Sequence, residues 1–319
     1  MAEDGRIVVL GEDILDPYGG AFKVTRGIST SYPDRTFTTP ICESTIAGMA
    51  VGLALRGMRP VAELMFGDFI TIAADQIINH AAKFHAMYNG AVELPLVIRT
   101  PMGGGRGYGP THSQSLEKIF LGIPHLRIVA PSQFHDPGAM LRAAIADDEP
   151  VLFIENKLLY PQQLRIESDD QFERNEWTGD GGYPTVLLAN DRSGLPPDVT
   201  IIAYGGIGSM LLPLMSRMAR EEIRVLACLP GSISPLRIEP ILEAAARSER
   251  VVIVEEGAPA FGWGAEVSTR IYEAIGPQLK RPIMRIGAAP TVIPASKQLE
   301  EKVLVSESDI EMAMMEMMA

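Results

Sequence analysis

Short runs of β-branched and aliphatic residues alternate with longer segments of helical spacing along almost the whole chain. In the first half, the short runs lie at residues 7–10, 59–63, 94–99, 127–130 and 151–155. This alternation is typical of a parallel sheet covered by helices. Continuous apolar runs of this length indicate strands that are buried on both faces. We therefore predict an α/β fold with mostly parallel sheets.

The alternation is interrupted once, between residues 159 and 197, where Gln, Asp, Glu, Gly and Pro dominate. At 319 residues the chain exceeds the length of about 250–300 residues at which single cores stop growing. We therefore expect two three-layer domains, residues 1–185 and 186–319, joined by an irregular linker with one short strand at 185–188. Strands in the second domain are expected at 199–203, 225–228 and 250–255. Helices are expected at 43–55, 69–85, 135–146, 210–221, 237–246 and 265–275, with a Met-rich terminal helix that packs on its own domain.

Charge and cysteine content exclude several classes of protein. Asp and Glu number 40 against 28 Lys and Arg, giving a net charge of -12 without a basic cluster, so nucleic acid is not an expected partner. The two cysteines, Cys42 and Cys228, exclude a disulfide framework and fit a reducing compartment. The sequence shows neither a secretory signal nor an apolar run of about 18 residues, so we expect no membrane partner and a cytoplasmic location.

Three features suggest a site, although each has an ordinary structural explanation. Glu43 opens a segment of apolar and small residues, and a carboxylate at a helix start usually serves only the helix dipole. The glycine-rich segment 103–109 follows an expected strand, but it lacks the Lys-Ser/Thr end and the helix-opening context of a nucleotide loop. His112 follows that segment, and a lone histidine in a loop is usually solvated.

Several short motifs stand in a fixed order along the chain, and together they carry more information than any one residue. They are Leu10-Gly11-Glu12-Asp13, Tyr18-Gly19-Gly20-Ala21-Phe22, Pro40-Ile41-Cys42-Glu43, Ala74-Asp75-Gln76-Ile77, Thr111-His112-Ser113-Gln114, Glu155-Asn156, Val254-Glu255-Glu256-Gly257 and Gly262-Trp263-Gly264-Ala265-Glu266. Over nearly its whole length the chain thereby resembles the beta subunit of the thiamine-diphosphate-dependent decarboxylating component of 2-oxo-acid dehydrogenase complexes. Members include the pyruvate, branched-chain and acetoin types.

The resemblance implies a fold and a set of site residues. It implies a transketolase-like pyrimidine-binding domain followed by a transketolase C-terminal-like domain. By similarity, Glu43 hydrogen-bonds a ring nitrogen of the cofactor's aminopyrimidine, Phe69 stacks on that ring, and Ile41 and Met65 line its pocket. His112 matches an active-site histidine that assists the handling of the acyl unit and its transfer to lipoamide. The positions implied for a potassium ion, bound largely through backbone carbonyls, are Leu96, Ala144, Ile145, Asp147 and Glu149.

The resemblance also implies partners. Thiamine diphosphate would lie between this chain and an alpha subunit that holds the magnesium. The chain shows no matching diphosphate motif, because Gly179-Asp180-Gly181 lies in the irregular linker, where we expect a turn, and Asn190 follows too soon. The resemblance therefore implies a chain that acts on a 2-oxo acid only within an α2β2 heterotetramer, with a lipoyl-bearing acyltransferase core as the next partner.

Two other functions stay open. One is the C-terminal half of a split transketolase or an acyloin-forming thiamine enzyme, for which Arg99 and Arg106 are the obvious residues that would bind a sugar phosphate. The other is a non-catalytic scaffold paralogue, although such a protein would have no need of Glu43, Phe69 and His112 together. The chain departs from the family at Arg237, which stands after Pro-Leu where Asp is common.

Overall fold

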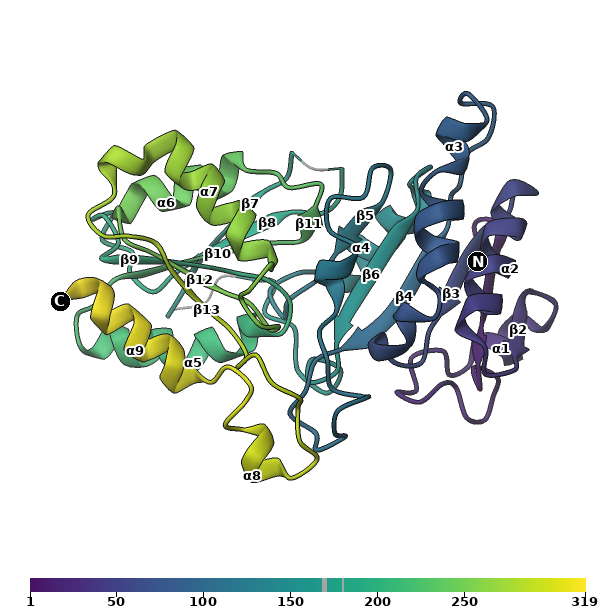
Figure 1. Ribbon diagram of the computed structural model, residues 1–319, viewed down its shortest axis with the longest axis horizontal. Coiled ribbons are helices and arrows are strands. Elements are labelled where there is room, and N and C mark those ends of the chain that lie inside the picture. Colours follow the sequence, from purple (N-terminus) through teal and green to yellow (C-terminus); the bar gives the residue numbers. More distant parts are fainter. Residues whose placement is uncertain (168–170, 180) are drawn as a thin grey trace.

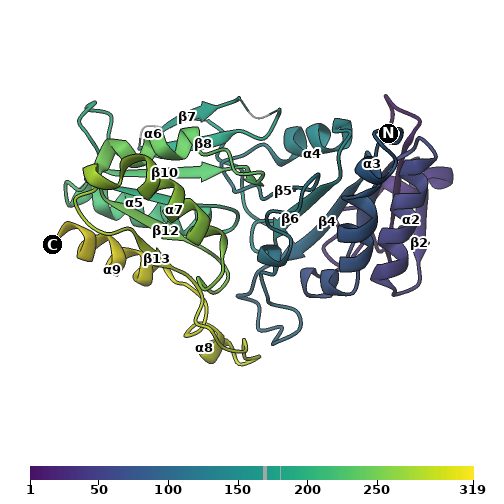
Figure 2. The ribbon, with the colours of Figure 1, turned by 45° about the horizontal axis from the view of Figure 1, so that its top comes forward.

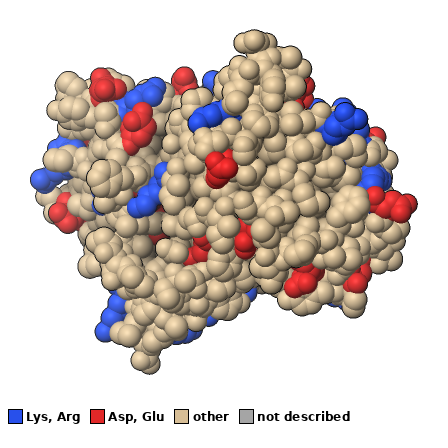
Figure 3. All heavy atoms as spheres, turned by 45° about the vertical axis from the view of Figure 1, so that its right-hand side comes forward, with Lys and Arg blue, Asp and Glu red and all other residues tan. Residues whose placement is uncertain are grey.

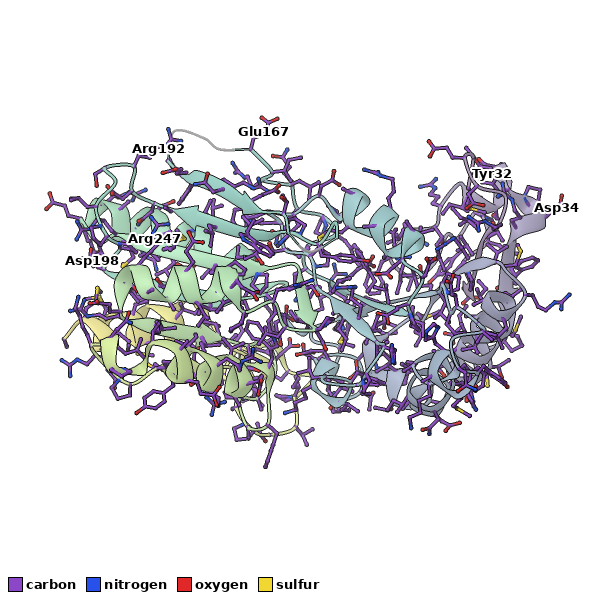
Figure 4. All side chains as sticks on the ribbon, turned by 90° about the horizontal axis from the view of Figure 1, so that it is seen from above. Tyr32, Asp34, Glu167, Arg192, Asp198 and Arg247 are labelled. Carbon is purple, nitrogen blue, oxygen red and sulfur yellow. The ribbon has the colours of Figure 1, made fainter. Side chains whose placement is uncertain are left out.

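The alternating segments form two sheets, which lie side by side in the computed structural model (Figure 1). The structure describes residues 1–167, 171–179 and 181–319, so Asp180, in the expected turn, lies outside them. Tyr32 and Asp34 mark the far end of the first unit, and Asp198 and Arg247 lie toward the opposite end of the molecule (Figure 4).

The first sheet contains seven strands in the order β11-β5-β6-β4-β3-β1-β2. Their bounds are β1 Ile7–Glu12, β2 Thr36–Thr39, β3 Arg59–Glu63, β4 Val97–Met102, β5 Arg127–Val129, β6 Val151–Asn156 and β11 Ser232–Ser234. All neighbours pair in parallel except β11, which runs antiparallel to β5. Because side chains alternate across a strand, Leu10 packs with helix α2 (Glu43–Leu55), whereas Val9 belongs to the cluster that contains helix α4 (Pro137–Ala146).

The second sheet contains six strands in the order β13-β12-β9-β10-β8-β7. Their bounds are β7 Glu173–Trp177, β8 Thr185–Ala189, β9 Val199–Ala203, β10 Val225–Pro230, β12 Val251–Val254 and β13 Met284–Ile286. Helices α6 (Glu239–Ser248) and α7 (Trp263–Ile275) cover one face, and α5 (Ile207–Arg220) and α9 (Glu307–Met318) cover the other (Figure 2). The remaining helical segments are α1 Ile28–Ser31, α3 Phe84–Met87, α8 Lys297–Glu300, a π-helix at Gln76–Ala81, and 3-10 turns at Pro33–Arg35, Gly67–Thr71, Glu117–Ile119 and Gly276–Gln278. No helix in the described ranges is both long and apolar enough to cross a bilayer.

The predicted fold class is confirmed, and three details of the prediction are wrong. The expected helix over residues 69–85 is instead broken into a 3-10 turn, a π-helix and the short α3, because apolar spacing alone does not distinguish these winding modes. Residues 159–197 contain two strands, β7 and β8, and both belong to the second sheet. The strand predicted at 151–155, now β6, was expected to be the last strand of the first half, but β11 joins the first sheet later in the chain. The domain boundary after residue 185 stays a prediction.

The two units share one hydrophobic core. The rings of Tyr204 and Trp263 in the second unit lie 5.2 Å apart, and the same cluster includes Phe120 of the first unit. The Trp263 indole N–H donates to the carbonyl of Ile233, at 3.1 Å, within β11. The terminal helix α9 also packs as predicted, with Met314 and Met317 buried in the second unit. The second unit is therefore fixed against the edge of the first sheet.

Candidate active site

Most residues singled out from the sequence follow the carboxyl ends of strands in the first sheet. Glu43 follows β2, Met65 and Phe69 follow β3, and His112 lies in the loop after β4. Neighbouring parallel strands end at the same edge, which is where ligands bind in open α/β sheets. The topology therefore places these four side chains along one edge of the sheet.

Glu43 is the first residue of α2, and only 4% of it is exposed. The helix dipole favours a carboxylate at this position. No residue in the described part of the chain donates a hydrogen bond to the Glu43 side chain. A largely buried carboxyl with unused hydrogen-bonding capacity is suited to bind a polar ring atom of a ligand, which would supply the missing partner.

A second carboxyl, Glu12, lies near Glu43 at the end of β1 and was not predicted as a site residue. It is 3% exposed, and its Oε1 atom has no hydrogen-bond partner among the described residues. Burial first, and then the neighbouring carboxylates of Glu43, Asp13 and Glu63, raise the pKa of Glu12 to about 7. The signal in the sequence was its place in the Leu10–Asp13 motif, but only the pairing of β1 with β2 brings it next to Glu43.

Arg99 joins two further carboxylates at the same edge, the buried Glu63 and the partly buried Glu155. Its Nη1 donates to Glu63 at 2.9 Å, and its Nε and Nη2 donate to both oxygens of Glu155 at 3.0 and 2.6 Å. Burial raises the pKa of Glu63, and the Arg99 guanidinium opposes this rise. Arg106 is also engaged, since its Nη2 donates to the carbonyl of Lys157 at 2.9 Å. Both arginines considered for a sugar phosphate therefore already have partners within the chain.

His112 is held among aromatic rings. Its imidazole meets Phe66 at 4.7 Å and Phe69 at 5.2 Å between ring centroids, in both cases edge to face. The structure therefore brings together His112 and Phe69, two of the residues named from the sequence. Phe66 was missed, although it lies in the same segment as Met65 and Phe69 and its ring contacts both His112 and Phe69.

Lys157, the residue after β6, was also missed. It is fully buried, and its Nζ donates to the backbone carbonyl of His112. The ammonium lies 5.4 Å from the centroid of the Phe66 ring, a cation–π distance. Burial lowers the pKa of Lys157 to about 8, and the charge of Asp68 opposes this shift. The sequence showed only a lysine after the Glu155-Asn156 motif, and nothing in it indicated burial.

Ile41 lies apart from the buried residues, because 76% of it is exposed just before α2. Met65 is only partly buried. The residues expected to line one side of the aminopyrimidine pocket are thus open to solvent in the single chain.

Three of the five positions expected to bind potassium through backbone carbonyls accept hydrogen bonds within the chain. The carbonyls of Ile145 and Asp147 both accept from Nη1 of Arg59, at 2.8 and 3.0 Å, and the Leu96 carbonyl accepts from the Val151 N–H. Within the described ranges, no group of three or more His, Cys, Asp or Glu residues could hold a metal ion. These hydrogen bonds use part of the acceptor capacity of the carbonyls and weigh against an open cation site, and we derive no role for potassium.

Comparison with known proteins agrees with this geometry. The family "Transketolase, pyrimidine binding domain" matches residues 1–163, and "Transketolase, C-terminal domain" matches residues 191–310. A solved structure titled as a split gene transketolase, an inactive beta4 tetramer, has the same fold, with a TM-score of 0.72 and 20% identity over 99% of this chain and 93% of that one.

Three curated relatives cover nearly the whole chain. The acetoin:2,6-dichlorophenolindophenol oxidoreductase beta subunit of Cupriavidus necator is 33% identical over 97% of this chain and 91% of its own length. The 2-oxoisovalerate dehydrogenase beta subunit of Bacillus subtilis is 35% identical over 99% and 94%. The mitochondrial pyruvate dehydrogenase E1 component subunit beta-1 of Arabidopsis thaliana is 34% identical over 97% and 83%. The chain therefore belongs to the family of 2-oxo-acid dehydrogenase E1 beta subunits, with the pyrimidine-binding and C-terminal domains of transketolase.

Proposed function

We propose that this chain is the beta subunit of a thiamine-diphosphate-dependent 2-oxo-acid dehydrogenase, which decarboxylates a 2-oxo acid and transfers the acyl unit to lipoamide. The observation that carries the proposal is Glu43, a buried carboxyl without a donor in the described chain, at the ligand-binding edge of a parallel sheet. A structural glutamate at a helix start would not need to be buried, because the dipole interaction operates at exposed positions as well.

The residues at this edge fit the aminopyrimidine half of the cofactor. Glu43 would bind a ring nitrogen through its open carboxyl, and Phe69 and Met65 would supply apolar contacts to the ring. When bound, thiamine diphosphate supplies the electron sink that decarboxylation of a 2-oxo acid requires. His112 would hold or move a proton at an imidazole nitrogen during transfer of the acyl unit.

An alpha subunit is the expected partner, because this chain presents only part of a pocket. Ile41 and the exposed side chains Met49 and Ile72 form apolar surface on and beside α2. Gly52 of α2 has open space where a side chain would be, which allows another helix to approach closely. Charged side chains are sparse across the middle of the face of the first unit that is turned forward in Figure 3.

Several features of the assembly are part of the same proposal. The alpha subunit would hold the magnesium and the diphosphate, in an α2β2 heterotetramer. A lipoyl-bearing acyltransferase core would receive the acyl unit. We expect the complex in the cytoplasm. Arg99 and Arg106 already donate hydrogen bonds to groups of this chain, which weighs against a sugar-phosphate substrate and hence against the transketolase alternative.

The test is reconstitution with the alpha subunit, thiamine diphosphate and magnesium. We expect decarboxylation of at least one of pyruvate or a branched-chain 2-oxo acid, or oxidation of acetoin, measured with dichlorophenolindophenol as the electron acceptor. Glu43→Gln should abolish this activity while the subunits still assemble, as measured by gel filtration. Glu239→Gln, the same change at the exposed first residue of α6, is the matched control and should remain active. Wild-type activity of Glu43→Gln would refute the assigned role.

A further inference from the structure

The glycine-rich loop that leads to His112 is shaped to bind an anion. Gly103, Gly105, Gly107 and Gly109 all have φ between 71° and 89°, in the left-handed region that glycine adopts without strain. Backbone N–H groups that converge from such a segment form a concave nest for anions. This is the physical reason why the segment looks like a phosphate loop in the sequence.

A carboxylate of the same chain fills this nest. The Gly105 N–H donates to Oε1 of Glu300 at 2.9 Å, and the Gly107 N–H donates to Oε2 at 2.8 Å. Glu300 is the last residue of α8, almost 200 residues further along the chain, and it is 1% exposed. A side chain at Gly104 would meet Leu304 at 2.6 Å, so the loop lies directly against the C-terminal segment.

The same loop is also held at His112 and just beyond it. Lys157 donates to the backbone carbonyl of His112. The backbone N–H and side-chain amide of Gln114 both donate to Oδ1 of Asp68, at 3.2 and 2.8 Å. The bonds to Glu300 come from the C-terminal unit, as does the bond that the Ser115 hydroxyl donates to Glu256 at 3.3 Å. The position of His112 therefore depends on a contact between the two units.

We propose that Glu300 is a positioning residue, which fixes His112 for the reaction by holding the glycine loop from the C-terminal unit. Glu300 itself touches no reacting group. The effect of Glu300 on the reaction rests on the function proposed above for His112. The contact between Glu300 and the glycine loop does not depend on that function. Glu300→Gln keeps the shape of the side chain but removes its charge and one of its two acceptor atoms.

Hydrogen exchange on the full chain tests the contact without any need for activity. Amides in the peptide spanning residues 103–112 should exchange roughly ten- to hundredfold faster in Glu300→Gln, because hydrogen bonds to a charged acceptor are lost. Glu301→Gln, an exposed neighbour, is the matched control and should exchange like the wild type. If Glu300→Gln does not fold by circular dichroism, Glu300→Asp, which retains the charge with a shorter reach, replaces it. Unchanged exchange in the folded variant would overturn the proposal.

A double-mutant cycle in the complex with the alpha subunit tests the positioning role. Glu300→Gln should slow acyl transfer to a lipoyl domain roughly ten- to hundredfold, as expected for a misplaced catalytic group, with little change in the KM of the oxo acid. In a His112→Ala background the same change should cost less than about twofold. Equal losses in both backgrounds would show that Glu300 acts independently of His112 and would refute the proposal. An inactive wild-type complex would refute the proposed function, and the exchange experiment would still decide the contact.

Discussion

Glu12→Gln should stabilise the protein at alkaline pH, because it removes a carboxyl that is buried beside other carboxylates. The pKa of Glu12 is about 7 in the fold against 4.5 for the ordinary group, and at about 1.4 kcal/mol per pKa unit this difference corresponds to about 3 kcal/mol. As the pH rises from 4.5 to 7, the unfolded chain releases this proton while the folded chain retains it, so the wild type loses stability. Above pH 7 the loss is complete. Gln does not ionise, so the variant avoids it.

Thermal unfolding at pH 5 and pH 8 measures this effect. At pH 8 the melting temperature of Glu12→Gln should exceed that of the wild type by roughly 5 °C, whereas at pH 5 the two should differ by only a small part of this. Glu3→Gln, the same change at an exposed residue outside the site, is the control and should shift stability by less than about 0.5 kcal/mol at either pH. No gain at pH 8, or an equal gain at both pH values, would refute the assignment of a buried charge to Glu12.

Three further predictions concern other charged groups. Arg99→Met should lower the free energy of unfolding, measured in urea, by about 3–5 kcal/mol, because it leaves the carboxylates of Glu63 and Glu155 without their arginine partner. Arg224→Met, which breaks a surface ion pair, is the control and should lower it by less than about 1 kcal/mol. Equal losses in the two variants would contradict the importance of the Arg99 ion pairs. Lys157→Met should leave the melting temperature unchanged or higher, since a buried ammonium is costly, yet slow the step that uses His112 by roughly tenfold in stopped-flow assays. An unchanged rate of this step in Lys157→Met would contradict a role for the contact between Lys157 and His112. Exchanging potassium for sodium in the buffer should change neither the melting temperature nor the activity, because Arg59 already donates to the carbonyls of Ile145 and Asp147. A melting temperature that depends on potassium would contradict this prediction.

The sequence predicted the elements with strong local signals. The helix Glu43–Leu55 and the strand Arg59–Glu63 have the bounds that we predicted, because each contains a run of apolar and small residues, 46–55 and 60–62, with polar residues on either side. Strands β7 and β11 were missed. Strand β7 is largely exposed and polar, and β11 has only three residues. Strand β7 pairs with the next strand, β8, whereas β11 pairs with β5 much earlier in the chain, and local patterns carry no information on such distant pairing.

The candidate site divides in the same way. Glu43 and His112 were named because they lie in motifs with a recognisable order, and Phe69 was named from the family resemblance that those motifs carry. Glu12 and Lys157 were not, since their importance comes from burial and from neighbours that only the folded chain provides. The raised pKa of Glu12 results first from burial and then from carboxylates that follow or end three different strands, and no spacing in the sequence reports that environment.

The antiparallel pairing of β11 with β5 has a consequence for how this protein can be divided. Strand β11 belongs by sequence to the C-terminal half, yet it supplies the edge strand of the N-terminal sheet. An N-terminal fragment would expose the backbone of β5, and an unpaired edge is a template for association with other chains. We therefore expect the two halves to depend on each other for folding, and recombination between genes of this kind would have to exchange both halves together to retain the seven-stranded sheet.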